Sequence, residues 1–218
     1  MGLGARCEPI RSALWSSLQD AQLEAPTAPG ELRVELPVGF PPLPAGVGET
    51  GECTRVDGPA ALAPHGQAVR LCCQRADEWR DDAFMRGCMF PSTCHFERDD
   101  GGEAWTPSEL AELLGPVETP AEALGMVALL HPEVLDPAAL TRGIGDFYGW
   151  QAYPDAPPVF AVDVLPEGFV VHAPAYAGCG CSHHLLRVAF RVTGEGCVEV
   201  LDEPREPLAY ASVAVCVD

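Results

Sequence analysis

Hydrophobic and polar residues alternate with a period of two through much of the C-terminal half, which predicts half-buried β-strands. The clearest segment is 184–192, where Leu186, Val188, Phe190 and Val192 fall on one face. Similar segments predict further strands at 159–164, 169–173, 197–201 and 211–217. Turn residues at 165–168 separate the first two of these strands, which we therefore expect to form a hairpin.

The last two predicted strands, 197–201 and 211–217, suggest a specific pairing. If they are antiparallel neighbours, Val198 and Val215 share the core face, and Cys197 lies opposite Cys216 on the other face. Directly opposed side chains bring their Cβ atoms close enough for a bridge. The pattern therefore predicts the disulfide Cys197–Cys216, which closes a loop of about 20 residues and stabilises by roughly 3 kcal/mol.

Three helices are predicted before these strands, at 107–114, 120–131 and 137–142. Thr106 and Glu109 have the spacing of a capping box at the first helix, and Thr119 and Glu122 repeat it at the second. In such a box the Thr and Glu side chains bond backbone N–H groups that the helix leaves without partners. These helix starts are therefore specified by local sequence.

The N-terminal part has a different sequence pattern. A helical stripe at 9–22 and an alternating strand at 31–36 are followed by a Pro- and Gly-rich loop. Residues 52–105 hold five cysteines and few aliphatic side chains, so we expect disulfides to hold this part together. The predicted fold class is α+β, with helices packed on one face of an antiparallel sheet and an irregular cysteine-rich N-terminal layer. The expected division is 1–105 and 106–218, either as two regions or as one continuous domain.

The charge of the chain excludes some partners. Among 218 residues, 32 are acidic and 13 are basic, all of them Arg, which gives a formal net charge of -19. Such a chain repels phosphate backbones and anionic membranes, so neither nucleic acid nor a membrane surface is expected as a partner. No apolar run approaches the ~20 residues of a membrane span.

The chain has ten cysteines, and this count is the most informative feature of its composition. Their even number and the absence of paired CxxC motifs favour disulfides formed in an oxidising compartment. Cys88 and Cys94 are expected to close a local loop, and the adjacent Cys72 and Cys73 to reach different partners. We therefore expect a secreted or periplasmic protein whose signal peptide has been removed, because the first residues lack an apolar segment; the alternative is a cytoplasmic protein.

One segment concentrates metal-ligand chemistry. Cys179, Cys181, His183 and His184 offer two thiols and two imidazoles, the donors that zinc or copper prefers. In an extended chain, however, His184 points to the face opposite the other three. The even cysteine count favours disulfides for both cysteines over a metal site, and a third interpretation makes one of them a catalytic nucleophile.

A second candidate segment is aromatic. Phe147, Tyr148, Trp150 and Tyr153 lie within seven residues between glycines and prolines. Exposed, such rings bind a ligand or a partner; buried, they fill a core.

The functional expectation follows from these features. The chain has no nucleophile elbow, zinc-protease motif, phosphate-binding loop or dinucleotide fingerprint. We therefore expect a disulfide-stabilised binding or interaction domain without catalytic activity, with a protein or small-molecule ligand and no cofactor. The alternatives are a zinc- or copper-binding protein and a cysteine-dependent enzyme, both using the Cys179–His184 segment.

Overall fold

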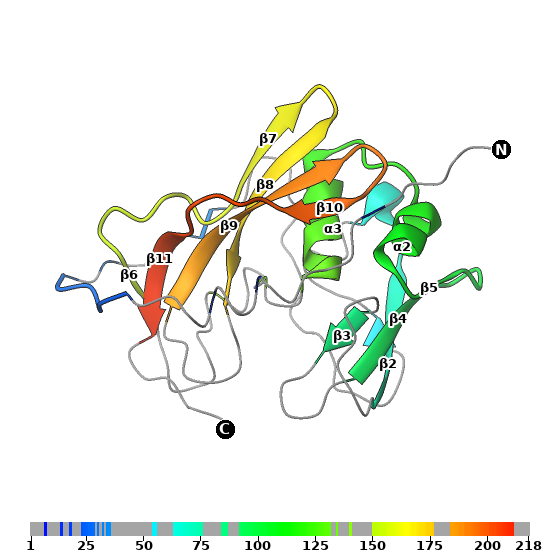
Figure 1. Cartoon of the computed structure of the whole chain (residues 1–218), viewed down its shortest axis with the longest axis horizontal. Helices are drawn as coiled ribbons and strands as arrows, with labels where there is room; N and C mark the ends of the chain where they lie inside the picture. Colours follow the sequence, from blue (N-terminus) through cyan, green and yellow to red (C-terminus); the bar gives the residue numbers. More distant parts are fainter. Residues whose placement is uncertain are drawn as a thin grey trace.

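The fold is mostly β (Figure 1). The computed structural model describes residues 7, 14, 18, 23–28, 30, 32, 34–35, 54–55, 63–75, 84–86, 92–131, 134, 140, 150–176 and 184–211. Within them lie eleven strands, two α-helices with described bounds and one short 3-10 helix, η2 (Pro64–Gly66). The strands form two antiparallel sheets.

The first sheet lies in the cysteine-rich region. Its strands are β1 (Thr54–Arg55), β2 (Val69–Arg75), β3 (Phe84–Arg86), β4 (Ser92–Arg98) and β5 (Glu103–Ala104). They are ordered β1-β2-β4-β3, with β5 paired to β4. The prediction of an irregular layer is therefore wrong for this part. The reason is that Cys73 and Cys94 take inward positions beside Leu71 and Phe96, so half-cystines replace the aliphatic residues that usually reveal a strand.

The second sheet is longer and curls into a half-barrel. Its strands are β6 (Trp150–Ala152), β7 (Ala161–Leu165), β8 (Gly168–Ala175), β9 (His184–Thr193), β10 (Val198–Val200) and β11 (Glu206–Ala211). They are ordered β6-β11-β9-β8-β7, with β10 paired to β9. The face of β9 that carries Leu186, Val188, Phe190 and Val192 is buried, as its alternation predicts.

The expected pairing of the last two strands is wrong. Val198 of β10 pairs with Val192 of β9, and β11 pairs with both β9 and β6. Because the turn at Thr193–Cys197 is tight, β10 folds directly back along β9. β10 and β11 then follow one another along the same edge of β9, so they cannot be neighbours. β11 also begins earlier than the predicted 211–217, of which only Ala211 lies in the described part.

The two helices, α2 (Pro107–Leu114) and α3 (Pro120–Leu130), start where the capping boxes place them, and both boxes are formed. α2 contacts β5 of the first sheet, whereas α3 contacts β7 to β10 of the second sheet and also η2. The predicted α+β class is therefore wrong, because the helices form no continuous layer over one sheet face. The third predicted helix, 137–142, lies outside the described residues except for the buried Leu140.

One hydrophobic core is shared by both sheets and both helices. Phe96, Leu110, Leu124 and Phe190 come from four different elements and are each at most 1 % exposed. Leu14 and Leu18, on the predicted N-terminal helical stripe, are helical and buried in the same core. The division of the chain at residue 105 stays a prediction.

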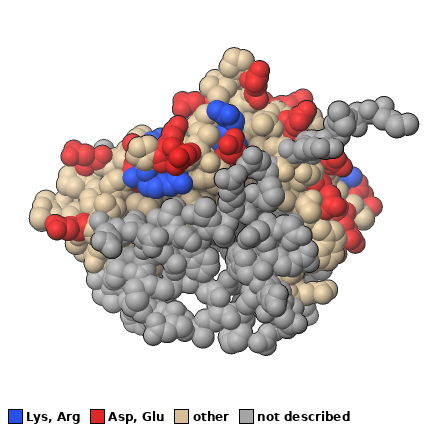
Figure 2. All heavy atoms as spheres, viewed as in Figure 1, with Lys and Arg blue, Asp and Glu red and all other residues tan. Residues whose placement is uncertain are grey.

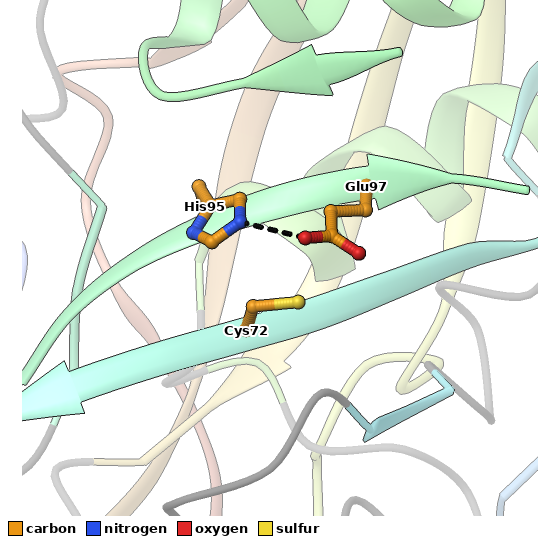
Figure 3. A group of neighbouring side chains, drawn as sticks. All are labelled: Cys72, His95 and Glu97. Carbon is orange, nitrogen blue, oxygen red and sulfur yellow. Dashed lines mark hydrogen bonds and ion pairs between the residues drawn. The ribbon is translucent and has the colours of Figure 1, made fainter. Parts of the chain in front are cut away.

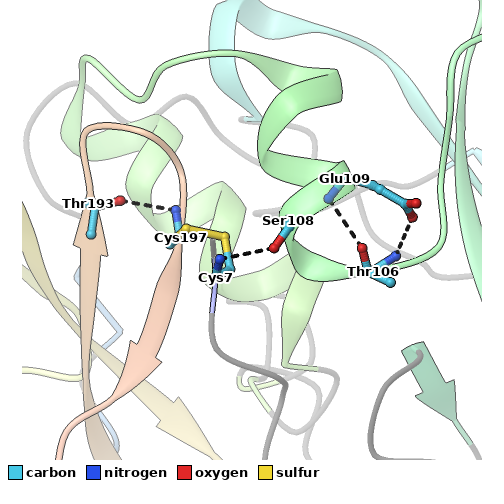
Figure 4. The surroundings of a disulfide bond; sticks show 6 residues. All are labelled: Cys7, Thr106, Ser108, Glu109, Thr193 and Cys197. Atoms are coloured by element: carbon cyan, nitrogen blue, oxygen red, sulfur yellow. Dashed lines mark hydrogen bonds between the residues drawn. A yellow bond between two sulfur atoms is a disulfide. The ribbon is translucent and has the colours of Figure 1, made fainter. Parts of the chain in front are cut away.

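Two disulfides join described cysteines. Cys7 is bonded to Cys197 and Cys73 to Cys94, so the predicted bridges Cys197–Cys216 and Cys88–Cys94 are wrong. Cys7 reaches the β9–β10 turn and also donates a backbone hydrogen bond of 3.0 Å to Ser108 of α2 (Figure 4). Cys73 and Cys72 have different partners, because Cys73 is bonded to Cys94 and Cys72 is itself disulfide-bonded. These bonds indicate an oxidising environment.

Candidate functional site

A groove opens between the N-terminal segment and the connection from β6 to β7. Its volume is about 450 Å³, within the range of small-molecule sites. It is lined by Gly30, Leu32, Glu35, Ala152, Tyr153, Pro154, Ala156, Pro157, Pro158 and Val159. The lining joins residues that are far apart in the sequence.

Backbone pairing holds the two walls together. Gly30 and Ala152 exchange two hydrogen bonds, of 2.9 and 3.1 Å, so Gly30 forms an isolated bridge at the outer edge of β6. Behind this bridge, Tyr153 donates its backbone N–H to Leu208 of β11. The groove is therefore anchored to the second sheet on one side and to the N-terminal segment on the other.

The Tyr153 side chain of the groove is held by a long-range hydrogen bond. Its hydroxyl donates a hydrogen bond of 2.8 Å to the carbonyl oxygen of Glu24. Burial, and then the nearby Tyr210, raise the pKa of Tyr153 above its ordinary value. The phenol therefore stays neutral at physiological pH and presents its ring as a fixed wall.

The rest of the lining contains three prolines and one carboxylate. Pro154, Pro157 and Pro158 have no backbone N–H to donate, and their fixed φ angles stiffen the wall. Glu35 is exposed and is the only charged residue of the described lining. The groove thus combines proline and aliphatic side chains with a larger share of polar surface and one carboxylate, which suits a ligand that carries a positive charge beside an apolar group.

The predicted aromatic cluster is divided by the fold. Trp150 lies on β6, half-buried against the core, with its ring edge-on to Tyr176 at 5.4 Å. Its role is core filling, whereas Tyr153 faces the groove. Phe147 and Tyr148 lie outside the described residues.

The predicted metal segment is only partly described, because Cys179, Cys181 and His183 lie outside the described residues. His184 is the first residue of β9 and is 6 % exposed. Its Nε2 accepts a hydrogen bond of 3.4 Å from the backbone N–H of Leu23, and its ring lies 5.5 Å from that of Tyr210. This nitrogen is therefore engaged in holding the N-terminal segment on the sheet.

A second polar group lies on the first sheet and was missed from the sequence. Cys72, His95 and Glu97 bring potential ligand atoms within 4.8 Å of one another, the one such group found among the described residues. His95 and Glu97 are two positions apart in β4, which puts both on the same face. Recognising 92–98 as a strand would have revealed this pair.

The surface charge is acidic but not continuous. Figure 2 shows several separate clusters of carboxylates on the described surface in view, with fewer basic side chains beside them. Two of the paired basic residues are Arg187, 2.6 Å from Glu206, and Arg191, 4.0 Å from Glu199. The exclusion of nucleic acid as a partner stays a prediction from this charge.

No family model, curated protein or solved structure matches the chain. Among the described residues, no helix is both long and apolar enough to cross a membrane. The groove and the disulfides are therefore the features of the molecule that bear on its function.

Proposed function

We propose that the protein is a secreted or periplasmic binding module, held by disulfides and without catalytic activity, that takes a cationic and partly apolar ligand. The observation that carries this proposal is the groove between the N-terminal segment and the β6–β7 connection, with Tyr153 on its wall and Glu35 as its charge. The disulfides Cys7–Cys197 and Cys73–Cys94 support the compartment, because such bonds persist outside reducing cytosols.

The absence of catalysis is supported by the chemistry of the groove. Its described lining offers one carboxylate and one phenol, but neither an imidazole nor a thiol. The phenol is hydrogen-bonded to a backbone carbonyl, and its raised pKa keeps it protonated at neutral pH, so it offers no free base there. A nucleophile paired with a base, which covalent catalysis requires, is thus missing from the described lining.

Benzylamine is a suitable probe, because it joins an aromatic ring to an ammonium group. We expect it to shift the NMR signals of Tyr153 and its neighbours with a dissociation constant on the order of 1 mM. The neutral isostere benzyl alcohol should bind more weakly, and the anion phenylacetate should not bind. Equal binding of all three probes, or shifts elsewhere only, would contradict the proposal.

Two variants separate the charge of the groove from the general acidity of the chain. Glu35→Gln should weaken benzylamine binding about threefold, the size expected of an exposed ion pair. Asp155→Asn is the matched control, because Asp155 is exposed near the groove but does not line it. If both variants weaken binding equally, the ligand is attracted by net charge alone and the groove is not its site.

A separate experiment tests the proposed oxidising compartment. Intact mass after alkylation, measured with and without prior reduction under denaturing conditions, counts the free thiols of the natural protein. Oxidation of Cys7, Cys73, Cys94 and Cys197 supports an oxidising compartment. Free thiols at these positions in protein isolated from its natural source would place it in a reducing one.

A further inference from the structure

The first sheet brings three metal-binding side chain types to one place. Cys72 of β2 is the register partner of His95 of β4, and Glu97 follows on the same face of β4. His95 Nε2 and Glu97 Oε1 are 3.1 Å apart. Figure 3 shows the Cys72 side chain on the neighbouring strand, beside this pair. All three side chains, those of His95, Glu97 and Cys72, thus face one small volume.

The His95 ring is held in place by its neighbours on the first sheet. The His95 side chain is 9 % exposed, and Trp105 stacks on its ring at 4.0 Å. Its Nε2 contacts Glu97, whereas its buried Nδ1 has no hydrogen-bond partner in the described part of the chain. The ring is therefore fixed in place with Nε2 toward Glu97, so Nε2 is the nitrogen that a metal ion between these side chains would bind.

The redox state of Cys72 decides what the group can do. Its sulfur is in a disulfide, and the sulfur ligand that metals take is the thiolate. In the oxidised protein the group therefore offers only the imidazole and the carboxylate. Breaking this disulfide adds the third ligand at a position that the sheet already fixes.

We propose that reduction of the Cys72 disulfide converts Cys72, His95 and Glu97 into a zinc(II) site. A dithiol reductant gives two electrons and two protons to the disulfide, which yields two cysteine thiols and the cyclic disulfide of the reductant. Zinc then binds the Cys72 thiolate with release of one proton, and water fills the fourth position. This site goes beyond the proposed binding function and does not depend on the groove. It forms only where a reductant opens the Cys72 disulfide, so an oxidising compartment keeps it without its third ligand.

The donor set and the geometry fit zinc. One thiolate, one imidazole and one carboxylate are typical zinc ligands, and the two negative charges balance the ion. Zinc bonds of about 2.0–2.3 Å in a tetrahedron place ligand atoms roughly 3.3–3.8 Å apart. The present spread of up to 4.8 Å therefore needs a closure of about 1 Å, which the partly exposed Glu97 and the released sulfur can provide.

Arg70 contacts Glu97 and therefore affects this closure. Its guanidinium lies 3.7 Å from Glu97 Oε2 and 3.7 Å from Asp99, and its side chain is 45 % exposed. It can therefore hold one carboxylate oxygen while the other, Oε1, faces the imidazole. Its positive charge opposes the ion, but at this exposure solvent weakens the repulsion.

Cobalt(II) tests the site because its complexes with thiolate absorb by sulfur-to-metal charge transfer. The full chain is reduced with a dithiol, freed of it under anaerobic conditions and titrated with cobalt(II). We expect one ion per chain with a charge-transfer band in the reduced protein and no band in the oxidised protein. Glu97→Gln should weaken binding at least tenfold. Reduced protein without a band, or an unaffected Glu97→Gln variant, would overturn the proposal.

His172→Gln is the matched control. His172 and Asp163 form another histidine–carboxylate pair, at 3.5 Å, on the second sheet. The variant should leave cobalt binding unchanged, because His172 is not part of the group formed by Cys72, His95 and Glu97. Equal losses for His172→Gln and Glu97→Gln would mean that the ion binds at scattered surface groups, which overturns the proposal.

Reduction also opens the other disulfides, so a second measurement guards against binding to an unfolded chain. The reduced protein is treated with iodoacetamide with and without zinc, and the labelled peptides are mapped. Selective protection of Cys72, lost in Glu97→Gln, supports the site. Equal protection of all cysteines, or a chain that unfolds on reduction and does not refold with zinc, contradicts it.

Discussion

Cys7 and Cys197 are separated by 190 positions and joined by a disulfide. The bond ties the N-terminal part to the turn between β9 and β10 of the second sheet. Cys7 also binds α2 through Ser108, so the same point joins three distant parts of the chain. The Cys197 backbone N–H is fixed in turn by the Thr193 hydroxyl at 3.2 Å.

Replacing both Cys7 and Cys197 by Ser should destabilise the protein strongly. In the chain-entropy model, a loop of about 190 residues contributes roughly 5 kcal/mol. This is an upper value, because other disulfides already restrict the unfolded chain. Urea unfolding followed by tryptophan fluorescence measures the loss.

The matched control is the double Ser variant of Cys73 and Cys94, whose separation is 21. The same model gives roughly 3 kcal/mol for a loop of this length. The first variant should therefore lose more stability than the second. The opposite order would show that packing of the buried Cys94 outweighs loop length.

Local chemistry and long-range contact explain which parts of the fold could be predicted. The starts of α2 and α3 follow from Thr106 and Thr119, because a capping box needs only four successive residues. The pairing of Cys7 with Cys197 depends on a contact between the two ends of the chain. No local pattern specifies such a contact, and opposing Cys197 with Cys216 rested on a strand pairing that β9 prevents.

The candidate groove was predictable only in part, for the same reason. Tyr153 belongs to the aromatic segment that the sequence singled out. Glu35 joins it because Gly30 pairs with Ala152, a long-range backbone contact without a side-chain signature. The group around His95 was missed because cysteines, a histidine and charged residues hid the alternation of β4.

Acid should destabilise the protein through His131. Burial lowers the pKa of this side chain from 6.5 to about 4, so the unfolded chain binds a proton at pH values where the folded protein does not. Stability is therefore complete above about pH 6.5 and falls as the pH drops toward 4, by about 3 kcal/mol for a shift of this size. Urea unfolding at pH 7, 6, 5 and 4 measures this slope, which His131→Gln should reduce. An unchanged slope in the variant would assign the acid sensitivity to other groups.

Glu122 should matter more to stability than Glu109, although both complete capping boxes. Glu122 accepts backbone hydrogen bonds from Glu118 and Thr119 and also, at 2.8 Å, from His65 of η2. Within the described part of the chain, the Glu109 carboxylate bonds only its own helix start, at Trp105 and Thr106. Glu122→Gln should cost about 1–2 kcal/mol and Glu109→Gln about half as much. Thermal unfolding of both variants at pH 7 tests the order.

The same carboxylate gives this comparison a pH dependence. Burial alone would raise the pKa of Glu122, but the hydrogen bonds from His65, Glu118 and Thr119 hold it below its ordinary value of 4.5. The ionised form therefore stabilises the fold above pH 4.5, and this contribution is lost as the pH falls through the lower pKa of the folded state. The deficit of Glu122→Gln should accordingly shrink in acid. A deficit that is equal at pH 7 and pH 3 would show that the charge is not what stabilises this cap.

We expect that a side chain at Gly168, in the β7–β8 hairpin, destabilises the protein. Its φ is +141°, and a Cβ atom there would lie 2.1 Å from the carbonyl oxygen of Val192. Since this oxygen belongs to β9, relief would require moving a central strand of the second sheet. Gly168→Ala should therefore cost more than about 2 kcal/mol of stability.

Gly194→Ala is the control, because a Cβ at Gly194 meets nothing within 4 Å. Urea unfolding should show a large loss for the first variant and a loss within about 0.5 kcal/mol for the second, whereas equal losses would mean that β9 moves aside easily.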